Sequence, residues 1–172
     1  MKVYKIGLVG CGRIGTLLEK DKLRGKPCTH AGGFNALSNT KIVAGCDIDR
    51  SRLKAFGMDW GVNRLYEDYL EMLHQEKLDV VCVATWTNLH ASMVMDVARS
   101  GVKAIFCEKP IALNPYDGRQ MVHFCKKRNV PLIINHERRW DSYYQKASQI
   151  IKTGKIGEIR TIVGNALSSK PG

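Results

Sequence analysis

The fold is decided near the start of the chain, by the stretch Lys5-Ile-Gly-Leu-Val-Gly-Cys-Gly-Arg-Ile-Gly15. Its first half is a short apolar run, which is typical of a buried strand. Three glycines then follow in the spacing G-x-G-x-x-G, at Gly10, Gly12 and Gly15. Glycines in this pattern allow a tight turn, leave room for a pyrophosphate against bare backbone, and let a helix pack closely on the strand. The stretch predicts a unit that binds a dinucleotide; the alternative is a plain turn between a strand and a helix.

The first helix is expected to run from Gly12 to about Lys20; residues 13–18 would open it, with its free N–H groups facing a phosphate. Residues 21–33 contain three glycines and a proline, and this composition indicates an insertion or loop. A short helix is expected to resume over residues 34–37.

The second strand is predicted over residues 41–47, and it ends in Asp47. A dinucleotide fold has a carboxylate at this place, where it accepts hydrogen bonds from the adenosine ribose hydroxyls. The gap from the glycines to Asp47 is longer than usual, and the insertion accounts for the excess. The alternative is that Asp47 caps the next helix, over residues 50–56, although Asp49 is also available as its cap.

The identity of the cofactor depends on the same carboxylate. Asp47 would repel a 2′-phosphate and bind the ribose diol, which predicts NAD. Arg50 and Arg52 are close in sequence and weaken this preference, so NADP is the alternative.

Strands and helices alternate at least five times along residues 1–136. The remaining strands are predicted over 79–84, 103–107 and 130–135, and the remaining helices over 66–74, 89–100 and 115–128. This alternation predicts an α/β fold, a doubly wound parallel Rossmann sheet that forms a dinucleotide-binding domain over residues 1–136.

The pattern changes after His136. A helix is predicted over residues 143–152 and a strand over residues 158–167, where apolar residues partly alternate. Because this strand has no sheet to pair with, we expect residues 137–172 to be the beginning of an incomplete α+β domain.

The carboxyl ends of the predicted strands carry polar residues, at the edge where open α/β sheets bind ligands. Lys109 is the strongest catalytic candidate, because it ends a buried strand beside Glu108 and precedes the rigid Pro110. A lysine there can hold a substrate hydroxyl or carbonyl and share in its proton transfer; the alternative is an ion pair with Glu108. His90 is expected to pack or to form hydrogen bonds rather than to act as a base, and His136 fits either role.

Composition argues against several other classes of protein. The net charge is +11, but the basic residues are scattered and are not interleaved with aromatic residues, so nucleic-acid binding is not favoured. No apolar run approaches the roughly 20 residues of a membrane span, and the N-terminus leads directly into the first strand, so we expect neither a membrane anchor nor a signal peptide. The six cysteines form no C-x-x-C pair and the five histidines lack ligand spacing. We therefore expect no metal site, reduced thiols and a cytoplasmic location.

Taken together, the motifs resemble those of the glucose–fructose oxidoreductase and inositol dehydrogenase family over nearly the whole chain. The resemblance is carried by residues 10–15, Asp47, residues 85–90, Glu108-Lys109-Pro110, Arg138-Arg139-Trp140 and Gly154-Lys-Ile-Gly-Glu158. It implies hydride transfer between NAD or NADP and a sugar, cyclitol or related polyol. It also implies that Lys109 helps to bind substrate and cofactor and that Arg138 reaches the substrate. The expected cofactor-binding residues are Gly10, Gly12, Arg13, Ile14, Gly15, Asp47, Ile48, Thr85, Trp86, Asn88, His90, Glu108 and Lys109.

Two departures from the family matter. Trp86 and Thr87 stand where the family usually has Pro-Asn, and Trp86 is expected to alter the nicotinamide pocket. The family's Asp and the catalytic His that follows it have no match, so we expect these residues alone to bind cofactor without turning over a polyol. A longer chain is expected to form a homo-oligomer. The alternatives are a dinucleotide-binding or sensing module without turnover, and a basic nucleic-acid-binding domain.

Overall fold

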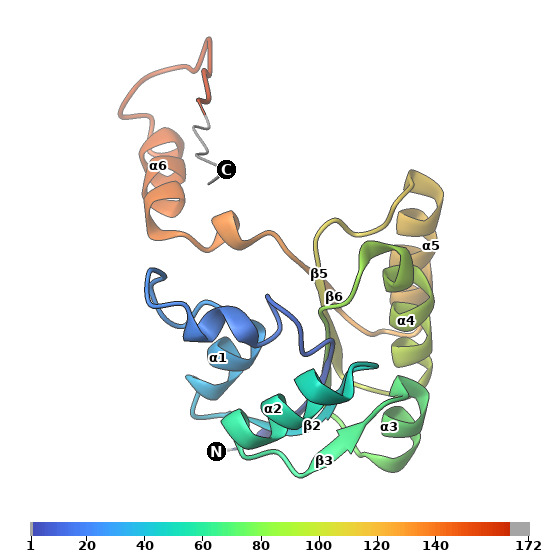
Figure 1. Cartoon of the computed structure of the whole chain (residues 1–172). Helices are drawn as coiled ribbons and strands as arrows, with labels where there is room; N and C mark the ends of the chain where they lie inside the picture. The colour runs from blue at the N-terminus through green and yellow to red at the C-terminus, as the bar shows by residue number, and fades with distance from the viewer. Residues whose placement is uncertain (1, 166–172) are drawn as a thin grey trace. The chain divides into compact units, whose positions relative to one another are not determined.

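The computed structural model describes residues 2–165 of the chain. Within them, six parallel strands form one sheet in the order β3-β2-β1-β4-β5-β6 (Figure 1). The strands are β1 (Tyr4–Val9), β2 (Thr40–Cys46), β3 (Arg64–Tyr66), β4 (Val80–Val83), β5 (Ala104–Glu108) and β6 (Leu132–Asn135). The strand order reverses between β1 and β4, as in doubly wound dinucleotide-binding sheets. The predicted parallel Rossmann fold is therefore confirmed.

Helices cover both faces of the sheet (Figure 1). One face carries α1 (His30–Asn35) and α2 (Arg50–Trp60), and the other carries α3 (Tyr69–Gln75), α4 (Thr87–Arg99) and α5 (Pro115–Lys127). Successive side chains of a strand point to opposite faces. In β4, Val81 and Val83 pack in the cluster of α3, α4 and α5, whereas Cys82 packs in the cluster that contains Phe56 of α2. The apolar run of β4 is therefore buried on both sides.

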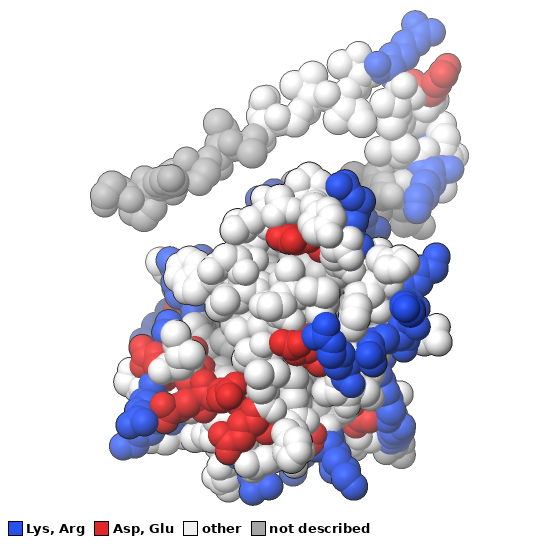
Figure 2. Space-filling model, turned by 90° about the vertical axis from the view of Figure 1, so that its right-hand side faces the viewer, with Lys and Arg blue, Asp and Glu red and all other residues white. Residues whose placement is uncertain are grey.

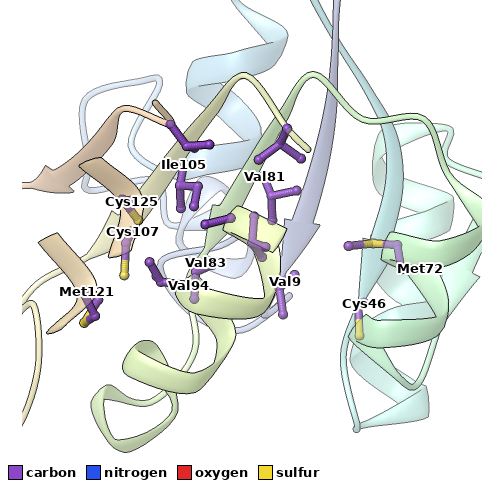
Figure 3. Close-up of a cluster of buried hydrophobic side chains, with 14 of the residues drawn as sticks. Val9, Cys46, Met72, Val81, Val83, Val94, Ile105, Cys107, Met121 and Cys125 are labelled. Carbon is purple, nitrogen blue, oxygen red and sulfur yellow. The ribbon is translucent and has the colours of Figure 1, made fainter. Parts of the chain in front are cut away.

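The larger hydrophobic cluster lies between the sheet and the helices α3, α4 and α5 (Figure 3). Val83, Val94, Ile105 and Met121 in this cluster have no exposed surface. Burial of an aliphatic side chain of this size contributes roughly 1.5–3 kcal/mol. This packing fixes the carboxyl ends of β4 and β5, where the candidate residues lie.

The sequence analysis missed β3 and placed two helix starts wrongly. A three-residue edge strand is too short to show the alternation that predicts strands. The helix predicted over 66–74 begins at Tyr69, because the carboxylate of Asp68 caps it by accepting the N–H of Leu70 at 2.8 Å. The helix predicted over 89–100 begins two residues earlier, as α4 at Thr87.

The helix predicted over residues 12–20 is wrong. Residues 12–16 form turns, and Leu17–Lys20 is a short 3-10 helix, η1. The α-helix begins instead at His30, within the predicted insertion, and ends at Asn35. The N–H of His30 donates to the Ile14 carbonyl at 3.0 Å, and the N–H of the next residue donates to the Gly15 carbonyl at 2.9 Å. In space, α1 therefore continues the turn that the glycines begin, and residues 17–29 are looped out.

A second compact unit begins at His136. Its described part, residues 136–165, contains η2 (Glu137–Arg139) and α6 (Ser142–Lys152), which Asp141 caps. The strand predicted over 158–167 is wrong for residues 158–165, which form no strand, and residues 166 and 167 lie outside the described residues. Hydrogen bonds to a neighbouring strand hold a strand in place, and residues 136–165 contain no neighbour that could provide them.

Candidate cofactor-binding and catalytic site

The glycine loop follows β1 at the carboxyl edge of the sheet. Gly10 has a φ of +96°, and a Cβ there would lie 2.6 Å from the Ala84 carbonyl oxygen. A Cβ on Gly15 would overlap the carbonyl oxygen of Gly10, so both positions require glycine. A Cβ on Gly12 would meet only the guanidinium of Arg52, at 3.8 Å. Gly12 therefore leaves open the space that a pyrophosphate needs against bare backbone.

The backbone beyond Gly12 also suits an anion. No acceptor among the described residues takes the N–H groups of Arg13 and Ile14. Unpaired N–H groups at such a turn attract phosphate oxygens. The loop therefore fits the phosphates of a dinucleotide on its own geometry.

Asp47, directly after β2, is buried and fastens the glycine loop to the sheet. Its Oδ2 accepts the N–H of Cys11 at 2.8 Å, and its Oδ1 accepts the N–H of Asp49 at 2.9 Å. Asp49 itself caps α2, and the guanidinium of Arg52 lies within ion-pair distance of both carboxylates, 3.4 Å from Asp47 and 3.2 Å from Asp49. Because an ionised carboxylate offers about four lone-pair positions, Asp47 keeps capacity for a ribose hydroxyl. Its neighbour Ile48 is 85 % exposed.

The two arginines at the start of α2 point to different partners. Arg50 pairs with Glu67, with 2.7 Å between Nε and the carboxylate oxygen. Arg52 lies across the glycine loop, with its guanidinium 3.4 Å from Asp47. Of these two arginines, it is Arg52 that bears on the choice between NAD and NADP.

The turn after β4 exposes Trp86. Its side chain is 81 % exposed, although tryptophan is usually largely buried. Asn88, in the first turn of α4, is also exposed, and the hydroxyl of Thr85 donates to the sulfur of Met93 at 3.5 Å. Contact of Thr85, Trp86 and Asn88 with the cofactor stays a prediction.

His90 faces the interior rather than the solvent. It has no exposed surface; its Nδ1 lies 3.0 Å from the carbonyl oxygen of Pro110, and its Nε2 lies 3.2 Å from that of Thr85. The ring therefore joins the turn after β4 to the turn after β5. This geometry favours the packing and hydrogen-bonding role, and any effect of His90 on the cofactor would act through these turns.

Glu108 ends β5, and its buried carboxylate holds three groups. Oε1 lies 2.8 Å from Nε2 of His30 and accepts the side-chain amide of Asn135 at 2.6 Å, while Oε2 accepts the N–H of Lys109 at 3.1 Å. Burial raises the pKa of Glu108, but the hydrogen bonds from His30 and Asn135 outweigh it and leave the pKa below its ordinary value. Burial lowers the pKa of His30, but the Cys82 sulfur and the Glu108 carboxylate outweigh it and raise the pKa above its ordinary value.

Lys109 is exposed, and its ammonium pairs with no carboxylate among residues 2–165. The carboxylate of Glu108 turns inward instead, so the structure does not contain the ion pair that was the alternative for this lysine. The ammonium of Lys109 is therefore available to a ligand at this edge of the sheet.

His30 is a residue that the sequence analysis missed as part of the site. It lies in the stretch predicted as an insertion, and nothing local indicates that its ring reaches β5. The sequence did contain one signal for a helix that begins at His30. Thr29 is a common helix-capping residue, and its hydroxyl accepts the N–H of Gly32 at 3.0 Å and so caps α1.

Arg138, the predicted substrate contact, belongs to the second unit. Its guanidinium donates to the hydroxyl of Tyr144 at 2.9 Å. His136 also belongs to this unit. Contact between Arg138 and a substrate stays a prediction.

Residues 2–165 contain no group of three potential metal ligands, and none of their helices has the length and hydropathy that crossing a bilayer requires. On the face of the first unit drawn in Figure 2, Asp and Glu form a large group at the lower left and smaller separate patches, and Lys and Arg lie mostly at the right-hand side.

Comparison with known proteins extends this picture. D-Apiose dehydrogenase of Paraburkholderia graminis is 36% identical over 157 residues, which are 91% of this chain and 38% of that protein. Myo-inositol 2-dehydrogenase of Thermotoga maritima is 31% identical over 154 residues, 90% of this chain and 42% of that protein. The chain thus spans about two-fifths of the length of these curated relatives.

Solved structures show the same likeness. An oxidoreductase from Agrobacterium radiobacter, in complex with NAD+, L-tartaric acid and magnesium, superposes with a TM-score of 0.76 at 30% identity, over 90% of this chain and 42% of that one. Scyllo-inositol dehydrogenase from Lactobacillus casei, with bound NAD(H) and scyllo-inositol, superposes with a TM-score of 0.80 at 25% identity, over 91% of this chain and 43% of that one.

The match to the family itself covers most of the first unit and confirms the resemblance that the motifs indicated. The model of the family described as "Oxidoreductase family, NAD-binding Rossmann fold" matches residues 4–136. The chain therefore belongs to this oxidoreductase family with an NAD-binding Rossmann fold.

Proposed function

We propose that these residues are the amino-terminal, cofactor-binding part of an oxidoreductase that transfers a hydride between NAD and a sugar, cyclitol or related polyol. The observation that carries the proposal is one combination at the carboxyl edge of the sheet. An open glycine loop lies at the end of β1, and Lys109, at the end of β5, has an ammonium that its neighbouring carboxylate does not hold. The relatives named above, dehydrogenases of D-apiose and of inositols, support the class of substrate.

The residues of the glycine loop would hold the cofactor. Gly12 would give the pyrophosphate access to the backbone, and the N–H groups of Arg13 and Ile14 would donate to its oxygens. Asp47 would accept hydrogen bonds from the adenosine ribose, and Trp86 would border the nicotinamide. When bound, NAD supplies the acceptor for the hydride.

Lys109 would act on the substrate. When a carbonyl is reduced, its ammonium would donate a hydrogen bond and then a proton to the carbonyl oxygen as the hydride arrives; when a carbinol is oxidised, the neutral amine would take that proton back. General acid–base help of this kind is worth about 10²–10⁴-fold in rate. Arg138 would provide a second contact to the substrate hydroxyls.

The second unit would begin a substrate-binding and oligomerisation domain, and the whole protein would form a homo-oligomer. In its described part, Trp140 and Tyr143 are exposed, at 64% and 82%. Exposed aromatic side chains of this kind are common at interfaces between subunits. A cytoplasmic location is supported by the six cysteines, all of which are free thiols.

The test mixes the purified chain with NAD and a panel of sugars, cyclitols and polyols, and follows the absorbance of reduced nicotinamide. We expect cofactor binding without sustained turnover, because these residues would be only part of the enzyme. Failure to bind NAD would overturn the proposal. Sustained turnover that Lys109→Ala abolishes would instead show that these residues form a complete enzyme.

A further inference from the structure

We infer that His30 is a positioning residue for Lys109. By holding the carboxylate of Glu108 in the interior, it leaves the ammonium of Lys109 free for a substrate. This inference rests on the proposed function, because His30 has this role only if Lys109 is the lysine that acts on the substrate.

Several groups compete for the carboxylate of Glu108. Its carboxylate directly precedes Lys109 in the chain, so the ammonium of that lysine is an obvious partner. The structure gives Oε1 to His30 and Asn135, and gives Oε2 to the backbone N–H of Lys109. The Glu108 side chain is about 8% exposed and that of His30 about 5%. The pair is therefore shielded from water, and the lysine side chain is left out of it.

Contacts of its backbone and of its ring hold His30 in this position. The hydroxyl of Thr29 caps α1, and the N–H of His30 bonds to the carbonyl of Ile14 in the glycine loop. The imidazole ring also meets Phe106 edge-on, with 5.3 Å between the ring centroids. The backbone of His30 is thus bound to the phosphate loop and its ring to the end of β5. One residue connects the two halves of the proposed site.

Removing the imidazole ring of His30 would leave the carboxylate of Glu108 without its cationic partner. A buried carboxylate that loses its cationic partner keeps the cost of desolvation without the compensating attraction. In His30→Gln the amide can still donate a hydrogen bond, but it carries no charge. The neighbouring cation available to Glu108 is then Lys109, and we expect the carboxylate and the ammonium to pair. Lys109 would become less reactive and less able to hold a substrate.

Other groups around the pair do not replace His30. Cys82 on β4 and Asn135 on β6 face the pair and carry no positive charge. Glu19 on η1 accepts the hydroxyl of Thr29 at the start of α1, and it adds a negative charge. His30 is therefore the group in this network that can compensate the charge of Glu108.

The experiment measures how fast Lys109 is acylated by acetic anhydride across a range of pH, with the peptides quantified by mass spectrometry. The exposed Lys54 serves as the internal reference in every sample. We compare the full chain with His30→Gln, Glu108→Gln and the double variant, and His123→Gln, on the exposed surface of α5, is the matched control. Circular dichroism establishes that each variant is folded.

We expect His30→Gln to slow the acylation of Lys109 roughly fivefold, the effect of an exposed ion pair of about 1 kcal/mol, and to move its pH midpoint upward. The double variant should restore the rate, because the competing carboxylate is gone. His123→Gln should have no effect. A general loss of structure would not produce this rescue, so the rescue identifies a positioning role.

An unchanged rate in His30→Gln, or a double variant that is not rescued, overturns the inference. If His30→Gln does not fold, Glu108→Gln alone decides: we expect its Lys109 to react like that of the wild type, and a severalfold faster reaction would show that Glu108 already pairs with Lys109. Calorimetric titration of the wild-type chain with NAD distinguishes failure of the proposed function from failure of the positioning role of His30. A chain that does not bind NAD refutes the proposed function, whereas a chain that binds NAD and shows no effect of His30→Gln refutes only the positioning role.

Discussion

The Nε2 atom of His30 lies 2.8 Å from Oε1 of Glu108, in a contact that joins α1 to the end of β5. The two residues are 78 positions apart in the sequence, and both are buried. The contact connects the helix that completes the glycine loop to the residue that precedes Lys109. The phosphate-binding and lysine-bearing parts of the proposed site are therefore one structural unit.

The first prediction concerns the dependence of stability on pH. The pKa of His30 is raised in the folded chain. The protonated ring therefore stabilises the fold fully when the pH is below the ordinary histidine pKa of about 6.5, and this stabilisation is lost as the pH rises through the pKa of the folded chain. The pKa of Glu108 is lowered, so its effect is complete above its ordinary value of about 4.3 and is lost as the pH falls through the folded value. The pair should stabilise the fold most near pH 6, between these limits.

Urea unfolding of the wild type and His30→Gln measures this effect. We expect a loss of roughly 3 kcal/mol in the free energy of unfolding near pH 6, and a smaller loss near pH 9.5. The control His123→Gln should match the wild type at both values. A loss that grows toward alkaline pH would contradict the assigned direction of the His30 shift.

The second prediction separates two glycines of the loop. Gly12→Ala should change the free energy of unfolding by less than about 0.5 kcal/mol, because its Cβ would meet only the Arg52 guanidinium, at 3.8 Å. It should nonetheless weaken NAD binding about tenfold or more, since the methyl group occupies the space of the pyrophosphate. Gly15→Ala should destabilise the fold, because its Cβ would overlap the carbonyl oxygen of Gly10. Thermal unfolding and calorimetry check both; equal destabilisation by the two variants would be evidence against an open space at Gly12.

The third prediction concerns Asp47. Asp47→Ala removes the acceptor of the N–H of Cys11 and the carboxylate expected to repel a 2′-phosphate. The preference for NAD over NADP should therefore fall, because Arg52 loses its contact with Asp47 and keeps only its pairing with Asp49. Asp68→Ala is the matched control: it removes the cap of α3, at a cost of about 1 kcal/mol, and should leave the preference unchanged. Calorimetric titration with both cofactors decides, and tighter binding of NADP by the wild type would refute the assignment.

The sheet could be predicted from sequence because its signals are local. The apolar run that became Val80–Val83 is buried on both faces, and the spacing of Gly10, Gly12 and Gly15 lies within six residues. Asp49 as the cap of α2 also follows from its neighbours alone.

The position of His30 could not be predicted in this way. Its contact with Glu108 depends on a helix that is interrupted for residues 17–29 and resumes against the carbonyl of Ile14, which no local pattern encodes. The strand predicted over 158–167 failed for a related reason. Alternation shows that a segment suits one face of a sheet, but only a neighbouring strand makes it a strand.

The open loop at Gly12 is proposed to bind NAD, and calorimetric titration of the folded chain with NAD tests this most directly. We predict saturable binding of one NAD per chain, which Gly12→Val abolishes while the variant keeps its secondary structure. A folded wild-type chain that gives no binding heat with NAD at any temperature tried, or a Gly12→Val variant that binds NAD as tightly as the wild type, would contradict the claim.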